Sequence, residues 1–152
     1  MKLLSAEAFD FVRKMKLGYL VSILPEEHGH LSRKGTLAVF DNGHLIIADM
    51  AESNPLEFHS NANVTVEVTD PFSRKGYRFH GKASLIPAKP EAAAYIAFYE
   101  SWGLKETACR VKNFILIEVG HFEAFIAPSF SWVTSGTVYY SREGNFNNLW
   151  KF

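Results

Sequence analysis

Hydrophobic and polar residues alternate along much of this chain with a period of two, which predicts strands. Residues 63–70 alternate strictly, with valines on one face and polar residues on the other. Residues 76–87 repeat the pattern, with apolar side chains facing one way and Arg78, His80 and Lys82 facing the other. The simplest interpretation of those three polar positions is a solvated outer face of a sheet.

Further apolar segments complete the set of expected strands. Residues 19–24 form one strand, and residues 31–50 form two strands joined by an Asp-Asn-Gly turn, a strong hairpin signal. The last strand spans residues 113–128 and bends at Gly120. The count is therefore six strands.

Three segments have the signals of helices. Residues 5–17 begin with Ser5 as an N-cap, and residues 90–103 begin at a proline and end at a glycine. A short helix is expected over residues 53–61, with Ser53 as its cap.

The order of these elements favours one fold class. Strands follow strands directly, without the strand–helix alternation of a parallel sheet. We therefore predict a mainly β fold, a six-stranded antiparallel barrel with helices covering its openings. The length of 152 residues indicates one domain over residues 1–152, with residues 129–152 as a C-terminal tail.

Composition excludes several classes of partner. Sixteen basic residues balance sixteen acidic ones, so no global charge attracts nucleic acid or an anionic membrane. No apolar run reaches the length of a membrane helix, and no signal-peptide core begins the chain. A single cysteine, Cys109, suits a reducing compartment. We therefore expect a cytoplasmic protein.

The clearest candidate chemistry is a phosphate site. Arg33 and Lys34 lie on one strand, and the predicted helix beginning at Ser53 follows the next strand. A helix start and a cation both favour a phosphate. Because successive strand residues point to opposite faces, at most one of the two cations touches the same phosphate. The alternative is that both cations are solvated and discourage edge-to-edge aggregation.

The sequence gives only weak signals for a metal site or a catalytic site. His28 and His30 lack a third metal ligand in the sequence, so no metal site is expected. No nucleophile–base motif is present, and no catalytic residue can be named.

The motifs in order resemble the FMN-binding split-barrel family, which includes pyridoxamine 5'-phosphate oxidase. The resemblance spans roughly residues 5–126. It is carried by the hairpin "GHLSRKGTLAVFDNGHLIIADM", the strand "NANVTVEV" and the strand "GYRFHGKASLI".

The resemblance implies a homodimer with FMN in a groove at the subunit interface. It places the family's FMN-contacting positions on the two hairpin strands and the following helix start, at Ser32, Arg33, Lys34, Gly35, Ile47, Ala48, Asp49, Ser53 and Asn54. Asn54 stands where the family often carries a cation, so Arg33 and Lys34 must then supply the charge. The aromatic tail is expected to cross to the partner and bring Trp132 near the flavin ring.

The resemblance thus implies an FMN-dependent oxidoreductase acting on a small-molecule substrate or electron donor. The alternatives are a non-catalytic flavin- or haem-binding protein and a deazaflavin-dependent reductase. The tail lacks the Arg-x-His motif with which the vitamin-producing oxidases of the family grip their substrate.

Overall fold

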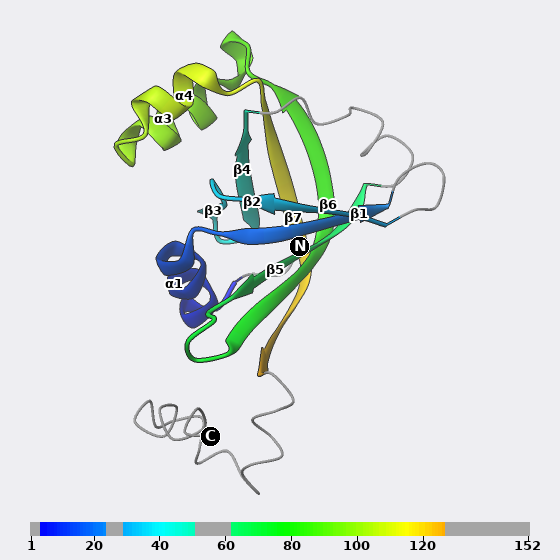
Figure 1. Cartoon of the computed structure of the whole chain (residues 1–152). Helices are drawn as coiled ribbons and strands as arrows, with labels where there is room; N and C mark the ends of the chain where they lie inside the picture. The colour runs from blue at the N-terminus through cyan, green and yellow to red at the C-terminus, as the bar shows by residue number, and fades with distance from the viewer. Residues whose placement is uncertain (1–3, 24–28, 51–61, 127–152) are drawn as a thin grey trace, which may run out of the picture.

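The computed structural model describes residues 4–23, 29–50 and 62–126, which form a seven-stranded antiparallel sheet with helices packed against it (Figure 1). The strands are β1 (Gly18–Ile23), β2 (Gly29–Lys34), β3 (Ala38–Asp41), β4 (His44–Asp49), β5 (Asn63–Thr69), β6 (Lys75–Pro87) and β7 (Asn113–Ile126). The helices are α1 (Ala6–Met15), the 3₁₀ turn η1 (Pro90–Ala92), α3 (Ala93–Ser101) and α4 (Lys105–Arg110). No helix in these ranges is both long and apolar enough to cross a membrane.

The strand order is β2-β1-β5-β6-β7-β4-β3, and every neighbouring pair is antiparallel. The sheet curls so that one face encloses a core. Strands β2 and β3 are the two ends of this order, which makes the barrel split rather than closed. The predicted fold class is therefore confirmed, although the strand count was one too low.

The extra strand arises because the predicted strand over residues 31–40 breaks at a turn. Gly35 and Thr36 form that turn, so β2 pairs with β1 while β3 pairs with β4. The Thr36 hydroxyl donates a hydrogen bond of 2.6 Å to the carbonyl of Ala48, which ties the turn to β4. One continuous run of strand-forming residues thus forms two strands, which pair with β1 and with β4.

Helix α1 begins as its sequence predicts. The Ser5 hydroxyl accepts a hydrogen bond from the Ala8 amide at 3.2 Å, and Lys16 adopts the left-handed conformation that ends the helix. Ala8 and Val12 are completely buried in the core. The helix therefore closes one end of the barrel.

Two cores lie on opposite faces of β4 and β7. The barrel interior is filled by alternate residues of six strands, among them Leu20, Leu45, Ile47, Val66, Phe79, Ile115 and Ile117. The other face packs against α3 and α4 through Ala38, Ile46, Ala48 and Phe114. The second helical region thus covers the outside of the sheet rather than an opening, and α4 was not foreseen from the sequence.

Tyr99 of α3 anchors this outer core. Its hydroxyl donates to the carbonyl oxygens of Thr36 at 2.8 Å and Ile46 at 3.2 Å. Burial raises the pKa of the Tyr99 hydroxyl far above its usual value, so it remains a donor at any physiological pH. The tyrosine thus shares its one hydroxyl proton between the turn that precedes β3 and the backbone of β4.

The long β6–β7 ribbon contains a bulge at Gly120. His80 pairs with His121 and Gly81 pairs with Val119, so Gly120 is an extra residue on β7. The bend predicted at this glycine is confirmed, and the ribbon curves strongly in Figure 1.

The bulge predicts different costs for its two glycines. A Cβ added at Gly81 would overlap the carbonyl of Glu118, whereas one at Gly120 would lie 3.7 Å from the nearest atom, the carbonyl oxygen of His80. We expect Gly81→Ala to lower the free energy of unfolding by about 1–3 kcal/mol. Gly120→Ala should change it by less than about 0.5 kcal/mol. Urea titration of both variants measures this difference, and equal losses would contradict the packing described.

Candidate functional site

A polar cluster lies on the inner face of β2, at the end of β4. The ammonium of Lys34 is 3.2 Å from Oδ1 of Asp49, and the two side chains are 14% and 4% exposed. Ser32 lies two residues before Lys34 and faces the same side. Its hydroxyl oxygen is buried, with no hydrogen-bond partner in the described part of the chain. The cluster thus holds a nearly buried ion pair and an unsatisfied hydroxyl.

Arg33 points to the opposite face of β2 from Lys34. It pairs with Tyr19 and is exposed, whereas Lys34 pairs with Gly18 and faces inward. The sequence prediction that the two cations diverge is therefore confirmed. Gly35 lies in the turn that follows, with open space where a side chain would be.

The predicted positions on β4 offer little side chain to a ligand. Ile47 is buried in the barrel interior and Ala48 beneath the helices. The carbonyl of Ala48 accepts from Thr36, and that of Asp49 accepts from the Lys112 amide at 3.0 Å. Contact between a flavin ring and these backbones remains a prediction. The remaining predicted positions, Ser53, Asn54 and Trp132, lie outside the described residues.

The electrostatics of the cluster limit what it can bind. Burying an ion pair costs desolvation energy on both partners, and removing one partner leaves the other unpaired. An incoming anion would share Lys34 with the Asp49 carboxylate and could take a hydrogen bond from Ser32. The cluster can therefore hold an anion only if hydrogen-bond donors around the ligand, such as the Ser32 hydroxyl, offset its repulsion by the Asp49 carboxylate.

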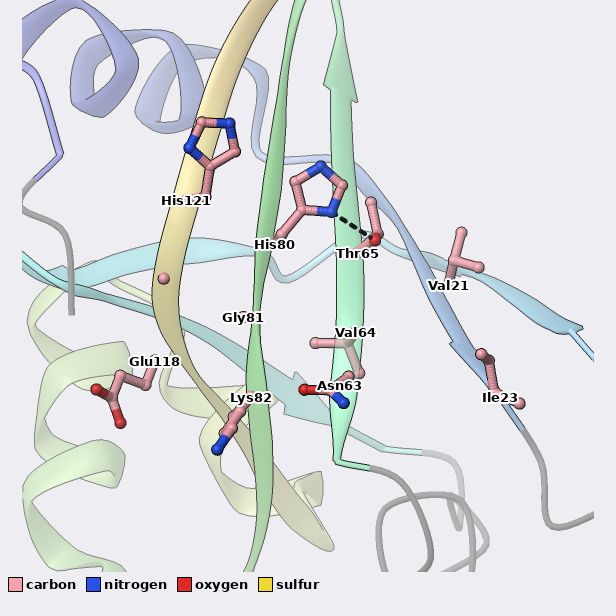
Figure 2. A pocket seen from close by; sticks show the side chains of 11 residues that line it. Val21, Ile23, Asn63, Val64, Thr65, His80, Gly81, Lys82, Glu118 and His121 are labelled. Atoms are coloured by element: carbon pink, nitrogen blue, oxygen red, sulfur yellow. Dashed lines mark hydrogen bonds between the residues drawn. The ribbon is translucent and has the colours of Figure 1, made fainter.

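A second feature, which we call the outer groove, lies on the opposite face of the sheet. It has a volume of about 670 Å³ and is lined by residues of four strands (Figure 2), namely Val21, Ile23, Asn63, Val64, Thr65, His80, Gly81, Lys82, Glu118, Gly120 and His121. Figure 2 shows His121, His80 and Thr65 along one side, with Glu118, Lys82 and Asn63 along the other. The hollow lies beside the Gly120 bulge.

Histidines dominate one side of the outer groove. The rings of His80 and His121 have centroids 6.0 Å apart and planes only 14° from parallel. Nδ1 of His80 lies 3.0 Å from the Thr65 hydroxyl, and its Nε2 lies 4.0 Å from a carboxylate oxygen of Glu123. Of these two contacts, only the one to Thr65 is short enough for a hydrogen bond, so Thr65 orients the His80 ring.

Sequence reasoning interpreted His80 and Lys82 only as a solvated strand face and did not single out His121. The missing information was the pairing of β6 with β7, which brings together residues 41 positions apart. In the described ranges, no group of three or more histidine, cysteine, aspartate or glutamate side chains could hold a metal ion.

The sequence matches no protein-family model, and no curated protein matches it. Solved structures do resemble the fold. HupZ of Group A Streptococcus has a TM-score of 0.69 and 14% identity, over 82% of this chain and 96% of its own. A putative pyridoxamine 5'-phosphate oxidase of Lactobacillus delbrueckii has a TM-score of 0.64 and 15% identity, over 81% and 95%. The FAD-binding protein of Mycobacterium smegmatis has a TM-score of 0.55 and 20% identity, over 83% and 99%.

At these identities the likeness concerns the path of the backbone. The matches nevertheless span nearly the full length of each of these solved structures. The chain therefore has the split-barrel fold of pyridoxamine 5'-phosphate oxidase-like proteins, the fold that its sequence motifs indicated.

Proposed function

We propose that this protein is an FMN-dependent oxidoreductase that acts as a cytoplasmic homodimer on a small-molecule substrate or electron donor. The observation that carries the proposal is the inner cluster of Ser32, Lys34 and Asp49, set in a fold shared with a FAD-binding protein and an F420 reductase. Its unsatisfied hydroxyl and nearly buried cation suit an anionic group.

The residues present fit the phosphate end of FMN. That phosphate carries close to two negative charges at neutral pH, since its second pKa is about 6. Lys34 would supply one charge-assisted hydrogen bond and Ser32 a second donor. Asp49 would keep Lys34 extended toward the site by pairing with it from one side. FMN, when bound, supplies the hydride or electron transfer, and the chain binds and orients it.

Two of the solved structures with a similar fold favour an alternative cofactor of related shape. One is an F420 reductase, which has a TM-score of 0.59, and another is the FAD-binding protein described above. A deazaflavin-dependent reductase, or a flavin-binding protein without turnover, would use the same fold. A non-catalytic haem-binding protein remains the third candidate.

The purified protein is expected to show flavin absorbance bands or to acquire them when FMN is added at micromolar concentration. Denaturation should release FMN rather than FAD, because the inner cluster suits a terminal phosphate. Chromatography and mass spectrometry of the released chromophore identify it. Consumption of NAD(P)H in the presence of an electron acceptor would indicate an enzyme. Stoichiometric binding of FMN without turnover would indicate a carrier. A colourless protein that ignores added FMN would overturn the proposal.

The homodimer is supported by an exposed apolar strip on the outer face of β1 and β2. Tyr19, Val21, Ile23 and Leu31 lie side by side there, with Tyr19 39% and Leu31 63% exposed. Contiguous apolar side chains on a sheet face mark protein interfaces. A second copy is the partner we propose, because twofold dimers are the commonest symmetric assembly.

A further inference from the structure

The turn between β5 and β6 presents an exposed aromatic side chain. Phe72 is 77% exposed, the highest value among the large apolar side chains that the structure describes. The Asp70 carboxylate accepts hydrogen bonds from the Phe72 amide at 2.9 Å and from the Ser73 hydroxyl at 2.8 Å. The Arg74 amide donates to the Asp70 carbonyl at 2.8 Å. These bonds hold the turn together while its aromatic ring stays in solvent.

Basic side chains gather around this turn. The last turn of α1 lies beside it (Figure 1), and Lys14 is close enough to the Asp70 carboxylate to interact with it electrostatically. Residues 13–17 and 69–75 together contain five cations and one carboxylate, namely Arg13, Lys14, Lys16, Arg74, Lys75 and Asp70. The three cations of α1 are exposed, and the two of the turn are partly exposed. Because the one carboxylate is engaged within the turn, positive charge is in excess around Phe72.

The excess is local and limits the kind of partner. The whole chain has equal numbers of basic and acidic residues, so folding rather than composition brings these cations together. A second copy of this surface would carry the same charge and be repelled. Residues 127–152 contain two basic residues and one acidic residue, so they offer no matching negative charge. Single-stranded nucleic acid stacks on several aromatic side chains in succession, whereas this surface has one.

We propose that the surface formed by Phe72 and the five cations around it binds an anionic lipid bilayer. The Phe72 ring enters the boundary between headgroups and acyl chains, and the cations attract acidic headgroups. A bilayer accepts a protruding ring without a preformed pocket, which a protein partner would have to supply. Binding is weak and reversible, because one aromatic ring and a few cations fall short of a stable anchor. It does not depend on FMN, since none of these residues belongs to the inner cluster.

Co-sedimentation of the full-length protein with lipid vesicles tests the proposal. The protein should bind phosphatidylcholine vesicles that contain phosphatidylserine, should not bind vesicles of phosphatidylcholine alone, and should be released by high salt. Lys14→Gln with Lys16→Gln should weaken binding about twenty-fivefold, since each cation at an anionic surface contributes about fivefold. Phe72→Ser should weaken it about tenfold, and Phe72→Trp should retain it because tryptophan is favoured at the same depth.

Helix α4 supplies matched controls at the other end of the sheet (Figure 1). Lys105→Gln with Arg110→Gln removes the same charge from exposed positions, and Leu104→Ser removes an apolar side chain that is 37% exposed. Both variants should bind vesicles like the wild type.

Equal binding to the two kinds of vesicle would overturn the proposal, as would wild-type affinity in Phe72→Ser or an equal loss in the α4 charge variant. Binding of single-stranded oligothymidine that depends on Phe72, without binding to either vesicle, would overturn it in favour of a nucleic acid. The measurement needs no flavin, so this proposal and the proposed FMN site can each fail without the other.

Discussion

Lys34→Met is expected to weaken FMN binding by about ten- to a hundredfold while changing riboflavin affinity little. The reason is that riboflavin lacks the phosphate, and one charge-assisted hydrogen bond contributes about 1.5–3 kcal/mol. Isothermal titration of both ligands against each variant measures the difference. Equal losses for the two ligands would mean that Lys34 does not contact the phosphate.

The same substitution should also destabilise the fold, because it removes the ammonium that lies 3.2 Å from the nearly buried carboxylate of Asp49. The expected loss in the free energy of unfolding is about 1.5–3 kcal/mol, the contribution of a hydrogen bond between charged groups. The double variant Lys34→Met with Asp49→Leu removes both charges and should recover most of that stability without recovering FMN affinity. It therefore separates the loss of a ligand contact from the loss of structure.

Arg33→Met is the matched control for Lys34. It removes the same charge one residue away, from an exposed side chain on the opposite face of β2. We expect a change in stability of less than about 0.5 kcal/mol and no discrimination between FMN and riboflavin. If Arg33→Met weakens FMN more than riboflavin and Lys34→Met does not, the phosphate binds on the outer face of β2.

Leu31→Glu is expected to convert the proposed dimer into a monomer at micromolar concentration. Leu31 is 63% exposed in the apolar strip, and a carboxylate buried at an interface would be left unpaired. Losing an interface hot spot costs at least about 2 kcal/mol, which weakens the dissociation constant by about thirtyfold or more. Light scattering or analytical ultracentrifugation across a dilution series measures the change.

Phe72→Glu provides the control for this prediction. Phe72 is 77% exposed in the turn between β5 and β6, outside the strip, and the change in charge is the same. It should leave the dimer intact. A wild-type protein that remains monomeric, or a Leu31→Glu variant as dimeric as Phe72→Glu, would remove the strip from the interface.

Local patterns predicted most of the secondary structure. The alternation over residues 63–70 gave β5 to within one residue, and Ser5 caps α1 as expected. These features depend on neighbours within a few positions, where backbone preference and burial act together. The prediction failed at Gly35 and Thr36, where strand-forming residues continue on both sides of a turn. No local signal distinguished one long strand from two that pair with different partners.

What the sequence by itself determined is therefore which residues share a face over residues 63–70 and 76–87, and that Arg33 and Lys34 point to opposite faces of their strand. Tertiary structure alone decided which of those faces meet. Lys34 lies beside Asp49 because the Gly35–Thr36 turn leads β2 into the β3–β4 hairpin. His80 lies beside His121 because the Gly120 bulge sets the register of β6 and β7. Register depends on the packing of the whole barrel, since a shift of one residue would turn every buried side chain of a strand outward.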